Sequence, residues 1–116
     1  MTDVEKGMHS MPSGSTRYRE LVTRTTHAVL DARGVTPSEW RWAAFHRRRD
    51  DLPIDLRSFI DTVAANAWRV TDADVESLKE AGHSEDAIFE VAAAAALGAA
   101  IVRLERGLIV LEESRA

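Results

Sequence analysis

The chain contains no cysteine among its 116 residues. This absence excludes disulfide bonds, thiolate nucleophiles, thiol redox chemistry and cysteine-ligated zinc. It also makes a reducing cytoplasm the expected compartment. The first 15 residues lack the apolar segment of a secretory signal and are rich in Gly, Ser and Pro. We therefore expect a flexible tail over residues 1–15 and a single domain over residues 16–116.

Basic charge and long apolar runs are also scarce. The formal net charge is −4, with 15 Lys and Arg against 19 Asp and Glu. This balance argues against general affinity for nucleic acids or anionic membranes. The longest apolar run, residues 91–102, is shorter than the about 20 residues that cross a bilayer. The sequence predicts a soluble protein whose partners are neither nucleic acid nor membrane.

Common catalytic and metal-binding motifs are missing as well. The spacing of the four histidines does not match HExxH or another metal-binding pattern; they are His9, His27, His46 and His83. No glycine-rich phosphate loop and no GxSxG motif occurs. The sequence therefore predicts neither a metal nor a cofactor.

Helical periodicity is present throughout, and strand-like alternation is absent. Apolar residues recur at intervals of three and four. The predicted helices cover residues 16–32, 36–48, 54–68 and 71–82, and a last one follows Ser84. The fold class is therefore all-α, with about five helices.

Capping signals mark the starts of these helices. Thr36 and Glu39 have the spacing of a capping box, with Pro37 at the first helical position. Thr71 and Asp74 have the same spacing, with Asp in place of the usual Glu or Gln. These signals predict that the second and fourth helices begin at side-chain caps.

The third predicted helix has a continuous apolar stripe, which is formed by Leu56, Phe59, Ile60, Val63, Ala67 and Trp68. This pattern places Trp68 in the core. Trp40 and Trp42 are two residues apart on one helix and cannot face the same way. One of these two is therefore a candidate contact for a partner subunit.

The last helix has an unusual composition. Residues 91–102 include no charged or polar side chain and are mostly alanine. A helix that is apolar on every face must be surrounded by protein, and small side chains let helices approach closely. So small a domain has too few other segments to cover every face. The sequence therefore predicts a homo-oligomer formed through helix packing.

Residues 56–108 resemble the core of carboxymuconolactone decarboxylase-like, or AhpD-like, proteins. The family pattern runs CxxCxxxH, then AxxxG[LVH][ST]xxxI, then an Ala-rich helix, and residues 80–88 read EAGHSEDAI. Counting back from Gly82, the cysteine positions correspond to Ala67 and Val70, and the histidine position to Asp74. The resemblance implies a multihelical fold that assembles as trimers or hexamers.

The departures from the family pattern limit the function. Thiol-dependent peroxide reduction needs both cysteines, so this activity is excluded. One hypothesis is an oligomeric module that binds a small molecule or a protein, with Trp68, Val70 and His27 as candidate pocket residues.

The alternative hypothesis is an acid–base enzyme of the decarboxylase type. It would act on a small organic acid or lactone, with Asp74, His83 and Asp55 as candidate catalytic residues and His27 as another proton partner. Asp74 also has a purely structural explanation, since the Thr71 box makes it a helix cap.

Overall fold

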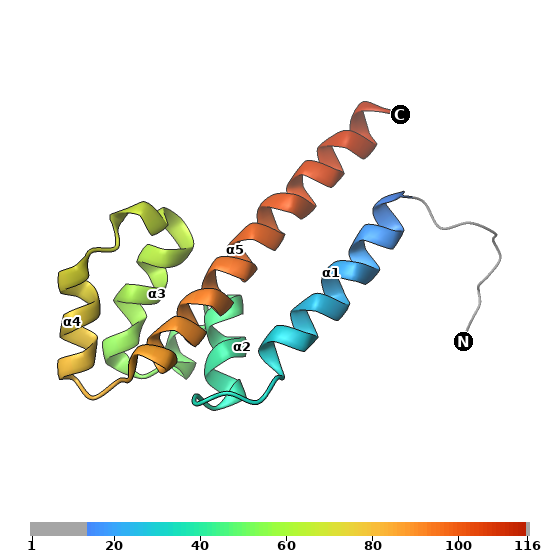
Figure 1. The fold of residues 1–116 in the computed structure, drawn as a ribbon. Coiled ribbons are helices and arrows are strands. Elements are labelled where there is room, and N and C mark those ends of the chain that lie inside the picture. The colour runs from blue at the N-terminus through green and yellow to red at the C-terminus, as the bar shows by residue number, and fades with distance from the viewer. Residues whose placement is uncertain (1–13, 116) are drawn as a thin grey trace.

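The computed structural model describes residues 14–115, and in this range every regular element is helical (Figure 1). Five α-helices are found: α1 (Gly14–Leu30), α2 (Ser38–His46), α3 (Ile54–Asn66), α4 (Asp72–Glu80) and α5 (Glu85–Ser114). Two 3-10 turns, Arg49–Asp51 and Ala67–Arg69, precede and follow α3. The predicted all-α class with five helices is confirmed.

The boundaries differ from the prediction at α1 and α3. Helix α1 begins at Gly14, so residues 14 and 15 are helical and not part of a tail. The rest of the predicted tail lies outside the described residues. Helix α3 ends at Asn66, whose φ of −152° is not helical, and the chain continues in a 3-10 turn. The predicted helix over residues 54–68 is therefore two residues too long.

The core forms where α2 and α3 pack against the proximal half of α5, which we define as residues 85–98. Its fully buried members include Ala43, Ile60 and Val91. Helices α2 and α5 approach so closely that a Cβ added at Gly98 would lie 2.0 Å from the carbonyl oxygen of Phe45. Small residues on α5 thus set the helix spacing in the core.

Local capping agrees with the prediction at α4 and α5. The Thr71 hydroxyl accepts from the amide of Asp74 at 3.2 Å, and the Asp74 carboxylate accepts from the amide of Thr71 at 2.9 Å. Ser84 Oγ accepts from the amide of Ala87 at 3.1 Å. Gly82 has a φ of +107°, a conformation that favours glycine at the end of α4.

The predicted capping box at Thr36 is wrong. Pro37 is the N-cap residue of α2, and no side chain caps this helix. The Thr36 hydroxyl instead donates to Glu90 Oε1 on α5 at 2.6 Å. The hydroxyl that the local pattern assigned to the start of α2 is therefore bound by a carboxylate distant in the sequence.

A buried arginine of α2 binds backbone carbonyls at the C-terminal end of α1. Arg41 is 5% exposed, and its guanidinium donates to the carbonyls of Leu30 at 2.9 Å, Ala32 at 2.5 Å and Thr36 at 2.7 Å. These bonds satisfy backbone oxygens that a helix end leaves without partners. Arg41 thereby holds the connection between α1 and α2 in one shape.

Glu90 binds the same connection from the α5 side. Its carboxylate accepts from the amides of Val35 at 2.8 Å and Thr36 at 2.9 Å, and it lies 3.5 Å from Arg41. Burial alone would raise the pKa of Glu90, but these hydrogen bonds and the arginine charge outweigh burial and lower it. The loop is therefore tied to α5 by an ionised carboxylate.

Beyond the core, α1 and the distal half of α5 (residues 99–114) extend side by side as an arm (Figure 1). Helix α5 has 30 residues, a length of about 45 Å. The radius of gyration is 17.3 Å, whereas a compact domain of this size has about 13 Å. Arg19 and Glu112 lie 4.0 Å apart across the arm. The arm therefore leaves much helix surface outside the core.

Candidate functional site

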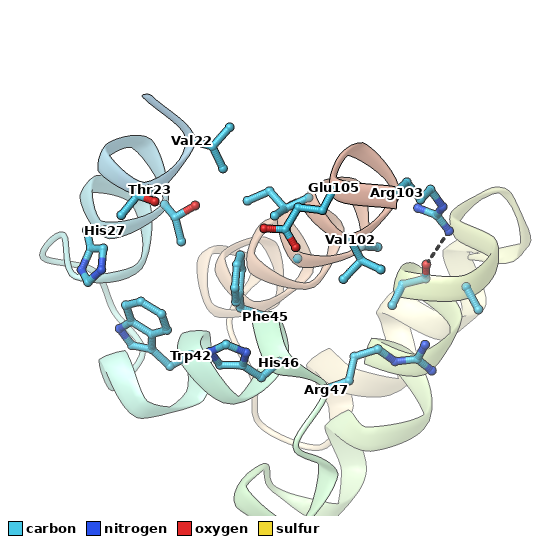
Figure 2. A pocket seen from close by; sticks show the side chains of 16 residues that line it. Val22, Thr23, His27, Trp42, Phe45, His46, Arg47, Val102, Arg103 and Glu105 are labelled. Carbon is cyan, nitrogen blue, oxygen red and sulfur yellow. Dashed lines mark hydrogen bonds between the residues drawn. The ribbon is translucent and has the colours of Figure 1, made fainter. Parts of the chain in front are cut away.

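A cleft of about 790 Å³ opens between α1, α2 and the middle of α5, with the end of α3 at one side (Figure 2). Its volume falls within the range of small-molecule sites. The lining includes apolar, aromatic and charged side chains: Val22, Thr23, Thr26, His27, Trp42, Phe45, His46, Arg47, Ala64, Ala65, Gly98, Ala99, Ile101, Val102, Arg103 and Glu105. We call this feature the α1–α2–α5 cleft.

Four rings form one wall of the cleft. Trp42 meets His27 edge to face, with ring centres 5.1 Å apart, and stacks on His46 at 5.8 Å. Phe45 contacts both Trp42 and His46 edge to face. His27, a predicted pocket residue, does line a cavity. His46 and Phe45 were not predicted, although the four-residue spacing of Trp42 and His46 is typical of stacked helical neighbours.

A carboxylate behind this wall fixes two of the rings. Trp42 Nε1 donates to Asp31 Oδ1 at 2.6 Å, and His27 Nδ1 lies 3.1 Å from Asp31 Oδ2. Hydrogen bonds from Trp42 and then His27 hold the pKa of Asp31 below its ordinary value. Asp31 is thus ionised at neutral pH and orients both rings.

The charged side chains of the cleft differ in their partners. Arg47 pairs with Asp61 at 3.3 Å, and Arg103 donates to the carbonyl of Ala64 at 3.2 Å. Glu105 has no hydrogen bond or ion pair within residues 14–115. Figure 2 shows its carboxylate directed into the cleft near Phe45.

Two of the predicted catalytic residues, Asp55 and His83, form a pair outside the α1–α2–α5 cleft. His83 Nε2 lies 3.0 Å from both carboxylate oxygens of Asp55, and the His83 side chain is 14% exposed. Trp40 packs edge to face on His83, with ring centres 6.2 Å apart. This pair joins the start of α3 to the turn before α5. Neither residue lines the α1–α2–α5 cleft.

The third predicted catalytic residue, Asp74, acts as a helix cap through its bond to the amide of Thr71. Its carboxylate is engaged in that cap, and it is not a hydrogen-bond partner of Asp55 or His83. Within the described chain, no group of three potential metal ligands is found.

The remaining predicted pocket residues lie away from the cavities. Trp68 is 80% exposed, so its predicted place in the core is wrong. The 3-10 turn Ala67–Arg69 breaks the helical phase that would have turned Trp68 inward. Val70 is partly buried against the core and does not line the α1–α2–α5 cleft.

One side of α5 is uncovered along most of its length. Phe89, Ala96, Ala100, Gly107 and Val110 are all exposed and recur at helical spacing. Phe89 is 72% exposed and Val110 61% exposed. A Cβ added at Gly107 would meet no atom within 4 Å. We call these five residues the outer face of α5.

Helix α5 is also long and apolar enough to cross a bilayer by length and composition, with a mean hydropathy of 1.9 in its most apolar window. Of that window, 28% is buried inside the protein. The apolar run of twelve residues is only part of this helix, which has 30 residues. Core helices of soluble proteins meet the same criterion. The outer face therefore has two candidate covers, a second copy of the chain and a lipid surface.

The chain was compared with known proteins in three ways. A scan against protein-family models, a search of curated proteins and a search of solved structures each found no match.

Proposed function

We propose that this chain is a homo-oligomeric, AhpD-like binding module without thiol peroxidase activity. The observation that supports it best is the outer face of α5, an apolar surface that the chain itself leaves exposed. Burying such a surface is favourable by about 25 cal/mol per Å². A second copy supplies the cover that a helix apolar on every side requires.

The side chains of the outer face fit an antiparallel pairing of two α5 helices. If Ala96 lies opposite Ala100 of the partner subunit, Phe89 lies opposite Gly107 of the partner subunit, because each is seven residues further along. The Phe89 ring then fills the space over Gly107 of the partner subunit, which has no side chain. The antiparallel arrangement also opposes the two helix dipoles favourably.

Charge does not obstruct this contact. Arg103 and Glu85 are charged residues on the same side of α5. Arg103 Nη2 donates to Ala64 of α3, and Glu85 is paired with Lys79 of α4 at 2.8 Å. An antiparallel contact of this kind has two-fold symmetry. It therefore favours a dimer, or a hexamer that contains two-fold contacts, over the trimer that the family resemblance also implies.

Native mass measurement tests the proposal. We expect the wild-type protein to run at an even multiple of 12.8 kDa and the Phe89→Ala and Gly107→Leu variants to dissociate. Gly107 has open space around it in its own chain, so the leucine does not disturb the monomer fold. Trp68→Ala is the matched control, since Trp68 is equally exposed on another surface. A monomeric wild type, or an unchanged Gly107→Leu oligomer, would show the proposal to be wrong.

Cross-linking tests the direction of the helices. Because the chain has no cysteine, engineered cysteines are the sole thiols. A mixture of Ala96→Cys and Ala100→Cys proteins should form a disulfide-linked heterodimer, whereas Ala100→Cys alone should not. Efficient cross-linking of Ala100→Cys alone would indicate a parallel pair. A monomer that floats with lipid vesicles would assign the outer face to a membrane.

A second candidate function follows from the Asp55–His83 pair. A carboxylate that holds an imidazole is a common arrangement for proton transfer, and it would suit the decarboxylase-type alternative. Neither residue of this pair lines the α1–α2–α5 cleft, and this favours the binding module over the enzyme. We expect no turnover of carboxylated lactones, followed by NMR. Turnover that is lost in His83→Gln and Asp55→Asn but kept in Asp74→Asn would establish the enzyme.

A further inference from the structure

We propose that the α1–α2–α5 cleft binds an organic cation, namely an amine or quaternary ammonium group on an apolar or planar body. This inference rests on the proposed function of a binding module and names the class of its ligand. The cleft volume of about 790 Å³ is sufficient for such a molecule.

The first argument is the charge that the cleft leaves unpaired. Glu105 points into the cleft and has no hydrogen bond or ion pair within the described chain (Figure 2). Glu105 is exposed to solvent at the cleft, and its unpaired negative charge attracts a positive ligand group. Glu105 is therefore the anchor for a positive ligand group.

The two arginines that line the cleft bind protein groups outside its ring wall. Arg47 is paired with Asp61, which also binds Arg49 at 2.9 Å. Arg103 donates to the end of α3, and Figure 2 shows it directed away from the rings. The ionised Asp31 lies directly behind the ring wall. The half of the cleft that contains the rings is therefore flanked by two carboxylates and by no arginine of the lining.

The rings supply the second part of a cation site. Indole and phenyl faces attract organic cations through their quadrupoles, and Trp does so best. Trp42 is held in place by its bond to Asp31, and Phe45 lies next to it at 5.9 Å between ring centres. A fixed ring pair beside a free carboxylate matches an ammonium group with an apolar body.

A buried hydroxyl on the same wall is also left without a partner. Thr26 is 6% exposed, and its Oγ1 has no hydrogen-bond partner among residues 14–115. Leaving such a group unsatisfied costs about 1–3 kcal/mol. Thr26 lines the cleft, so this wall contains one polar group whose hydrogen bond the described chain does not supply.

Calorimetric titration with three probes that share a benzyl group tests the proposal: benzyltrimethylammonium, benzylamine and phenylacetate. We expect both cations to bind and the anion to bind at least tenfold more weakly. The Glu105→Gln variant should bind benzyltrimethylammonium about tenfold more weakly, because the charge is removed with the shape kept. Trp42→Leu should weaken it several-fold. Glu80→Gln, on exposed α4, is the control and should leave binding unchanged.

The outcomes separate this inference from the proposed function. Tighter binding of phenylacetate, or no effect of Glu105→Gln, would overturn the cation assignment and leave a ligand site in the cleft. No binding of any probe to a protein of the expected oligomeric mass would overturn the site and leave the α5 assembly standing. Binding to the dissociated Gly107→Leu variant alone would show that a second copy covers the cleft, which also contradicts the inference.

Discussion

The proximal and distal halves of α5 are continuous in one helix but have opposite surroundings. The proximal half buries Ile88, Val91 and Gly98 against α2 and α3. The distal half has more large apolar side chains, yet Val102, Ile109, Val110 and Leu111 are about half exposed or more. Residue size therefore does not decide which half is buried.

The two glycines of α5 explain the difference. Gly98 is required because any side chain would collide with the backbone of Phe45. Small residues thus make the proximal half a close-packed contact within the chain. Gly107 touches nothing in its own chain, although glycine costs a helix about 1 kcal/mol relative to alanine. The distal half contacts α1 on one side, but its outer side has the composition of a contact surface and is left exposed by the described chain.

The largest predicted effect is at the junction that supports the proximal half. Arg41→Ala removes the buried guanidinium and leaves Glu90 and three backbone carbonyls without it. We expect the free energy of unfolding to fall by about 3–5 kcal/mol, measured by urea denaturation. Arg47→Ala, an exposed ion pair, is the control and should cost less than about 1 kcal/mol. Equal effects of the two substitutions would contradict the assigned role of Arg41.

The two glycines should respond to alanine with opposite signs. Both substitutions are compared in the Phe89→Ala background, where association through the outer face is weakened. Gly98→Ala should lower the free energy of unfolding by about 1–3 kcal/mol, because α2 and α5 must separate. Gly107→Ala should raise it by up to about 1 kcal/mol through helix propensity. Thermal and urea unfolding measure both, and a tolerated Gly98→Ala would disprove the close approach of α2.

Acid should weaken the proximal half through Glu90. The pKa of Glu90 is lower in the folded protein than the ordinary value of 4.5. Its contribution to stability is therefore complete above that value and is lost as the pH falls through the folded pKa. Between neutral pH and about pH 3, the wild type should lose more stability than Glu90→Gln. Parallel pH profiles of the two proteins would show that Glu90 does not contribute in this way.

Local features were predicted well from the sequence. The caps formed by Thr71 with Asp74 and by Ser84 involve residues within three positions of each other, so no tertiary information is needed. Trp68 was assigned to the wrong environment because the helical phase was extended past Asn66. The predicted capping role of Thr36 was wrong because the hydroxyl binds Glu90, which is 54 residues away in the sequence.

The cleft could be predicted only in part. His27 was predicted as a pocket residue, whereas Trp42 was considered as a contact for a partner subunit and Glu105 was not singled out. These side chains come from three helices, and their meeting depends on the angle at which α1 and α5 leave the core. The Asp55–His83 pair likewise joins two candidates whose contact no sequence spacing indicates.

The sequence by itself determined the helices, most of their caps, the apolar character of α5 and the absence of thiol chemistry, because each depends on residue type and near neighbours. The tertiary structure alone decided which half of α5 is buried, which carboxylates are paired and where a cleft opens. These properties depend on the close approach of α2 to Gly98 and on the Arg41–Glu90 junction, which fix how the helices diverge.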